Sequence, residues 1–192
     1  MVSAEHEVMA RHFDFQVLTK AANMGVRLNS YGSTRVEQGS YIKDPDCSFK
    51  PPPVNRRTWP TFVVEVGWSE TANKLAVDAE GWLEAEGSET QLVVTIKIER
   101  NSPKIIIQRW EKTGSRVITR NNRASSEPTQ QVEISYDNGR TTVSAPLQLP
   151  FEKVFDRSKN PNNPLHRDMI FSCEDLIDLA EREWETHGIA NF

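Results

Sequence analysis

The sequence predicts an α/β protein in which a mixed β-sheet lies between helices. Apolar residues recur at helical spacing near both ends of the chain and in its middle, and short runs rich in β-branched residues separate these stretches. A nearly continuous apolar run at residues 61–66 suits a central strand that is covered on both faces. At 192 residues the chain has the length of a single domain.

The predicted elements of the first half are a helix at residues 4–23, a hairpin at 35–38 and 40–42, a short strand at 46–49, a strand at 61–66 and a helix at 71–86. Gly39 marks the turn of the hairpin. Prolines 51 to 53 exclude a regular ladder, so the strand before them must be short. Gly87 ends the second helix.

The predicted elements of the second half are a hairpin at residues 92–98 and 104–110, a loop at 114–130, a hairpin at 132–136 and 141–147, a loop at 150–164 and a helix at 172–187. Asn138-Gly139 is a strong hairpin turn signal. The loop at 114–130 is polar and lacks periodicity, so we interpret its arginines as solvated rather than as phosphate contacts; they are Arg116, Arg120 and Arg123.

Composition restricts the function classes. The formal net charge of -4 argues against a constitutive nucleic-acid binder that relies on an overall positive potential. Cys47 and Cys173 cannot form a disulfide framework and no secretory leader pattern is visible, so we expect an intracellular location, cytoplasmic or nuclear. No apolar run approaches the roughly 20 residues that span a bilayer, so we expect no membrane insertion.

Glu65 is the residue of the central strand that needs an explanation. Its neighbours are apolar, and a carboxylate in such a run risks desolvation. Because side chains alternate along a strand, Val63, Glu65 and Gly67 share one face, and Glu65 can look into a cleft near the strand's end. The alternative is a structural role, in which Glu65 forms an ion pair or accepts hydrogen bonds from backbone amides.

Asp46 follows Pro45 at the start of another short strand. If the two strands lie side by side, Asp46 and Glu65 can converge on one hard cation. Magnesium suits this arrangement because it takes oxygen ligands and typically uses one or two protein carboxylates plus waters and substrate phosphates. The alternative for Asp46 is turn chemistry, since aspartate readily accepts hydrogen bonds from nearby backbone amides.

The chain resembles the PD-(D/E)xK superfamily of restriction-endonuclease-like nucleases, most closely its Uma2-like branch. The resemblance lies in Pro45-Asp46, in the strand with Val64-Glu65-Val66, and in the order helix, hairpin, strand, strand, helix, strand. The resemblance covers about residues 4–110 of a single domain at 1–192, and the rest is an elaboration with a further hairpin and helix. It implies a restriction-endonuclease-like mixed sheet flanked by helices, DNA cleavage that depends on Mg²⁺ or Mn²⁺, and Asp46 and Glu65 as metal ligands.

The sequence departs from the family pattern at one position. The family's lysine stands two residues after the second carboxylate, where this chain has Gly67. Lys74 in the following helix and Lys97 on the next strand are the candidates for the missing ammonium, which would position water or hold a phosphate. Lys74 also precedes Asp78 by four residues, a spacing that allows an ordinary exposed ion pair.

Glu5 or Glu7 in the first helix is the candidate for the family's auxiliary acidic residue. The four histidines show no metal-ligand spacing with the cysteines, so we assign none of them a catalytic role; they are His6, His12, His166 and His187.

Two functions of different classes follow. The first is a magnesium-dependent DNA endonuclease, in which Asp46 and Glu65 hold the metal and Lys74 or Lys97 assists. The second is a catalytically inactive nuclease-like domain that serves as a binding or regulatory module, with a homodimer as one arrangement; Gly67 and the long polar insertions favour it. A third reading is an enzyme of another phosphoester class, or a host-directed effector on the same scaffold.

Overall fold

The structure is a computed structural model, which describes residues 4–54, 57–68, 71–99, 102–113 and 125–186. Its helices are α1 (Ala4–Asn23), α2 (Ala72–Glu84), α3 (Phe151–Phe155) and α4 (Cys173–Thr186). The strands of the main sheet are β1 (Asn29–Ser30), β4 (Cys47–Lys50), β5 (Phe62–Trp68), β6 (Leu92–Ile98), β7 (Lys104–Thr113), β8 (Ser125–Asp137) and β9 (Arg140–Val143). Two small sheets pair β2 (Val36–Gln38) with β3 (Tyr41–Lys43), and β10 (Leu147–Leu149) with β11 (Met169–Phe171).

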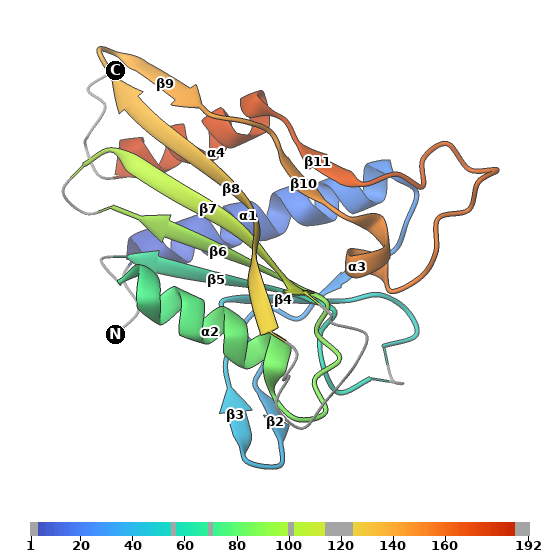
Figure 1. Cartoon of the computed structure of the whole chain (residues 1–192). Helices are drawn as coiled ribbons and strands as arrows, with labels where there is room; N and C mark the ends of the chain where they lie inside the picture. Colours follow the sequence, from blue (N-terminus) through green and yellow to red (C-terminus); the bar gives the residue numbers. More distant parts are fainter. Residues whose placement is uncertain (1–3, 55–56, 69–70, 100–101, 114–124, 187–192) are drawn as a thin grey trace.

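The main sheet has the strand order β1-β4-β5-β6-β7-β8-β9 and lies between α2 on one face and α1 with α4 on the other (Figure 1). The neighbours β5 and β6 are parallel, because α2 connects them as a crossover, and the other neighbouring pairs are antiparallel. The predicted fold class is therefore confirmed. The arrangement is consistent with a restriction-endonuclease-like fold, with the β8–β9 hairpin and α4 as the C-terminal additions.

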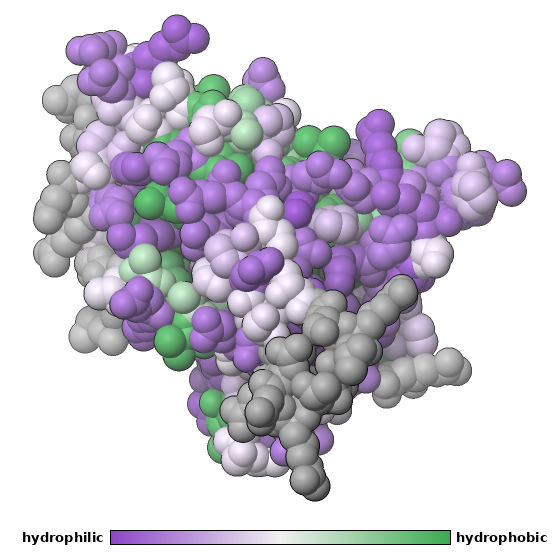
Figure 2. All heavy atoms as spheres, in the orientation of Figure 1, coloured by the Kyte–Doolittle hydropathy of each residue, from purple (hydrophilic) through white to green (hydrophobic). Residues whose placement is uncertain are grey.

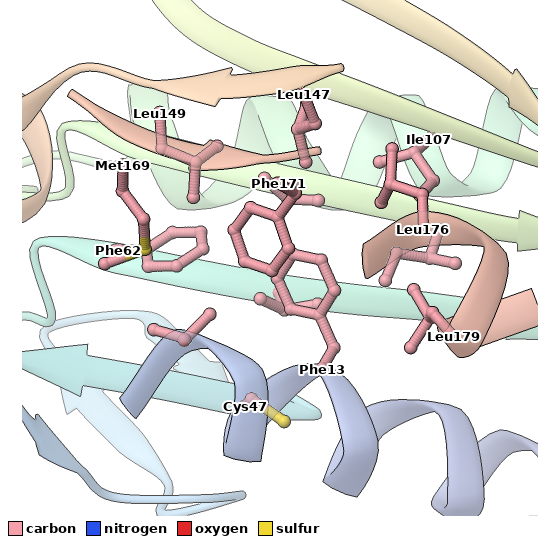
Figure 3. Close-up of a cluster of buried hydrophobic side chains, with 14 of the residues drawn as sticks. Phe13, Cys47, Phe62, Ile107, Leu147, Leu149, Met169, Phe171, Leu176 and Leu179 are labelled. Atoms are coloured by element: carbon pink, nitrogen blue, oxygen red, sulfur yellow. The ribbon is translucent and has the colours of Figure 1, made fainter. Parts of the chain in front are cut away.

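The face that α1 and α4 cover carries the larger apolar core. Alternation along β5 directs Phe62, Val64 and Val66 to this side, where they join apolar side chains from α1, α4 and β11. Phe13 of α1 stacks on Phe171 of β11 with ring centroids 4.8 Å apart, at the centre of the cluster in Figure 3. Aromatic and aliphatic side chains fill this side of the sheet, so the packing of α1 and α4 on the sheet is stabilised by apolar burial.

The face that α2 covers has a smaller apolar core and buried polar groups. Val63 and Val93 pack there against Trp82 of α2. Glu65 and Thr95 stand opposite each other in the β5–β6 register, and both are buried on this face. The outer surface on the α2 side is mostly hydrophilic, with small separate hydrophobic areas (Figure 2).

Some expected boundaries were wrong. Residues 125–130 belong to β8 rather than to a loop, because they continue the ladder with β7 beyond an irregularity at Arg109 and Trp110. The expected loop at 150–164 contains α3, which buries Phe151, Val154 and Phe155. Arg116, Arg120, Arg123 and His187 lie outside the described residues.

The second strand of the predicted 132–147 hairpin is divided, because β9 ends at Val143 and Leu147 begins β10. β10 pairs with β11, which the sequence patterns did not predict. Within the part of the chain that the structure describes, no helix is long and apolar enough to cross a membrane.

Candidate functional site

Asp46 lies where β4 begins, beside the central strand. Cys47 pairs with Val64 at the end of the antiparallel β4–β5 ladder, so Asp46 stands one residue beyond this pair and lies beside β5 at Glu65 and Val66. The backbone N–H of Val66 donates a hydrogen bond to Oδ2 of Asp46 at 2.7 Å. The Asp46 side chain thus supplies an acceptor to β5 just beyond the last backbone pair between β4 and β5. Nε2 of His6, from the first turns of α1, lies 3.1 Å from the same oxygen.

Glu65 lies beneath α2 and is only 6% exposed. Its Oε1 accepts a hydrogen bond from the indole N–H of Trp82 and lies 3.2 Å from Nζ of Lys43. The same ammonium lies 2.5 Å from Oδ1 of Asp78 on α2. A lysine from the β2–β3 hairpin thus bridges a strand carboxylate and a helix carboxylate.

The surroundings of Glu65 favour its protonated form. Burial raises the pKa of Glu65 to about 7, and the nearby charges of Asp46 and Asp78 raise it too, whereas Lys43 and the Trp82 hydrogen bond oppose the shift. The influence of Asp46 on this pKa is consistent with the closeness that the register gives the two carboxylates. Near neutral pH, Glu65 therefore exists in both protonation states, and a cation would favour the charged one.

Each carboxylate is oriented through one oxygen. The contacts given above involve Oδ2 of Asp46 and Oε1 of Glu65. Oxygen donors of this kind fit a hard divalent cation. Among the described residues, no three or more His, Cys, Asp or Glu side chains form a group that could hold a metal ion, so the candidate site offers two carboxylates.

The two predicted lysines differ in their relation to the site. Lys97 pairs with Gly67 in the parallel β5–β6 register, so its side chain leaves the same face as Glu65, beside the position that lacks a side chain. Its Nζ lies 2.5 Å from Oε1 of Glu99. Lys74 is exposed in the first turn of α2, and Asp78, which helical spacing would pair with it, lies against Lys43.

Sequence reasoning missed three members of the site. Lys43 was not considered, although it stands only three residues before Asp46. Trp82 stands at an apolar position of its helix, where the pattern gives no sign of a bond to Glu65, and His6 was given no catalytic role. The strand and helix patterns could not reveal these contacts, because each one joins elements that are distant along the chain.

Glu7, one of the two expected auxiliary acids, does not join the site. Glu7 pairs with Arg11 on the surface of α1, with Oε1 2.6 Å from Nε. The side chain of Glu5 lies outside the described residues. Among the described side chains of α1, that of His6 contacts Asp46.

Comparisons with known proteins give a likeness in structure alone. No protein-family model and no curated protein matches the chain. Among solved structures, the chain is similar to a candidate nuclease belonging to DUF820 from Anabaena variabilis ATCC 29413, with 13% sequence identity and a TM-score of 0.45 over 94% of this chain and 84% of that one. A likeness at this level concerns the path of the backbone and says nothing of the chemistry, which the side chains must decide.

Proposed function

We propose that the protein is a divalent-metal-dependent phosphodiesterase of the PD-(D/E)xK type that acts on nucleic acid, with DNA as the expected substrate. The observation that carries the proposal is the position of Asp46 beside β5 next to Glu65, with each carboxylate held through one oxygen. Two carboxylates that meet in this way match the sparse protein ligation that Mg²⁺ and Mn²⁺ accept, with water and substrate phosphate as the remaining ligands.

Each residue has a specific role in this proposal. Oδ1 of Asp46 and Oε2 of Glu65 would hold Mg²⁺ or Mn²⁺, which when bound activates water and neutralises charge on the phosphate. The Val66 N–H and His6 keep Asp46 in place. Lys97 would hold a phosphate oxygen, since it leaves the sheet beside Gly67 on the face of Glu65, which favours it over the exposed Lys74.

A second function has its own support. Glu65 is already matched by Lys43 and Trp82, and Gly67 stands where the family has a lysine. A domain whose second carboxylate is satisfied by its own chain can keep the fold without turnover. In this alternative the protein is an inactive nuclease-like binding or regulatory module, for which a homodimer is one arrangement.

Cleavage assays separate the two functions. We expect the protein to cut plasmid DNA, single-stranded DNA or RNA in the presence of Mg²⁺ or Mn²⁺, and to lose this activity in Asp46→Asn and in Glu65→Gln, which keep the shape of each side chain while removing a charge. Both ions should raise the thermal midpoint of the native chain more than that of a variant carrying both Asp46→Asn and Glu65→Gln. If no substrate is cut with either ion although the midpoint rises, the inactive module is the correct function.

A further inference from the structure

The ammonium group of Lys43 is buried between two carboxylates. It lies 3.2 Å from Oε1 of Glu65 and 2.5 Å from Oδ1 of Asp78, and the Lys43 side chain is 21% exposed. It also lies over the ring of Trp82, 5.7 Å from the centroid. The chain's own cation thus neutralises the carboxylate that we propose as a metal ligand.

Packing fixes this lysine at the end of the β2–β3 hairpin. Tyr41, two residues earlier on β3, packs against both Trp59 and Trp82, with ring centroids 5.1 Å and 5.5 Å away. On the other side, Asp44 and Pro45 connect Lys43 to Asp46. One short segment therefore brings to Glu65 both the partner carboxylate of the candidate site and a positive charge.

We propose that Lys43 competes with the divalent cation for Glu65 and thereby sets the affinity of the site. The inference rests on the proposed metal site and adds how its occupancy is controlled. A positive charge in contact with one oxygen of Glu65 repels a cation at the other oxygen, and this repulsion is weakly screened because the group is buried. Asp78 opposes the effect, since it draws the ammonium toward α2 and adds a negative charge near the site.

The proposal predicts opposite effects for two substitutions, measured by calorimetric titration of the full chain with Mn²⁺ and with Mg²⁺. At a pH above the Glu65 pKa, where competition from the proton is removed, Lys43→Met should tighten cation binding roughly tenfold or more, because it removes the competing charge while keeping the length of the side chain. Asp78→Asn should weaken binding several-fold, because the ammonium is then left to Glu65 alone. A purely structural role would lower the affinity in both variants or in neither.

Lys20→Met is the matched control, because Nζ of Lys20 lies 2.6 Å from Oδ2 of Asp175 and its side chain is 19% exposed, away from Glu65. Its cation affinity should equal that of the wild type. The proposal is overturned if folded Lys43→Met binds Mn²⁺ no more tightly than the wild type, or if Asp78→Asn binds it as tightly or more tightly. Should Lys43→Met not fold, the Asp78→Asn titration still decides.

A failure of the proposed function gives a different result from a failure of the role of Lys43. If the wild type binds neither ion and Asp46→Asn changes nothing, the two-carboxylate site is wrong. Lys43→Met should even then gain Mn²⁺ binding at Glu65 and Asp78, since their charges are no longer balanced. If Lys43→Met gains no Mn²⁺ binding, the proposed role of Lys43 is wrong.

Discussion

The two faces of the main sheet share the same strands but differ in the polarity of the side chains that they bury. On the α1 and α4 side, Phe62, Val64 and Val66 of β5 meet an aromatic and aliphatic core. On the α2 side, Val63 joins a small apolar cluster beside the buried Glu65 and Thr95, whose oxygens accept hydrogen bonds from the indole N–H groups of Trp82 and Trp110.

The α2 side of the sheet accommodates charge, whereas the α1 and α4 side is apolar. A carboxylate is costly in an apolar interior unless it is paired or hydrogen-bonded. The large core behind the sheet provides apolar burial, so the other face can hold Glu65, Lys43 and Asp78 in one cluster. Substitutions on the α1 and α4 side should therefore change the free energy of unfolding alone. Substitutions on the α2 side should change the pH dependence of that free energy or the affinity for cations.

The largest expected effect is that of Phe13→Ala on the α1 side. Phe13 is fully buried and stacks on Phe171, so its truncation should lower the free energy of unfolding by about 3–5 kcal/mol. Chemical denaturation with circular dichroism measures this change. The cation affinity of the folded fraction should not move, and a change there would break the division between the faces.

A smaller effect concerns Glu65 and pH. Between its ordinary pKa of 4.5 and its folded value of about 7, the folded protein keeps the Glu65 proton while the unfolded chain has lost it. The free energy of unfolding should therefore fall as pH rises through this window, by roughly 3 kcal/mol relative to Glu65→Gln, and level off above it. Denaturation curves of both proteins from pH 4 to pH 8 would show it, and parallel pH profiles would contradict it.

The smallest effect is that of Tyr41→Phe. The Tyr41 hydroxyl is buried and finds no hydrogen-bond partner among the described residues, although its ring packs on Trp59 and Trp82. Removing the hydroxyl should leave the free energy of unfolding within about 1 kcal/mol of the wild type, on the stabilising side if it changes at all. A large loss would mean that the hydroxyl supports the charged cluster of Glu65, Lys43 and Asp78.

Much of the fold could be predicted because its signals are local. Apolar spacing gave α1, α2 and α4, and Asn138-Gly139 gave the turn between β8 and β9. The first half of β8 was missed because Ser125 to Gln130 are mostly exposed polar residues, which join the sheet through backbone pairing with β7 rather than through apolar side chains. The α3 helix was missed because its five residues are too few to show a helical period.

The amino-acid sequence alone singles out Asp46 and Glu65, because an aspartate after a proline and a charged residue in an apolar strand are visible without coordinates. Only the tertiary structure decided what meets them: Lys43 and Trp82 at Glu65, His6 at Asp46, and Lys97 beside Gly67. The physical reason is that local patterns govern the conformation of a segment. The register of strands and the packing of helices govern which distant side chains share a space.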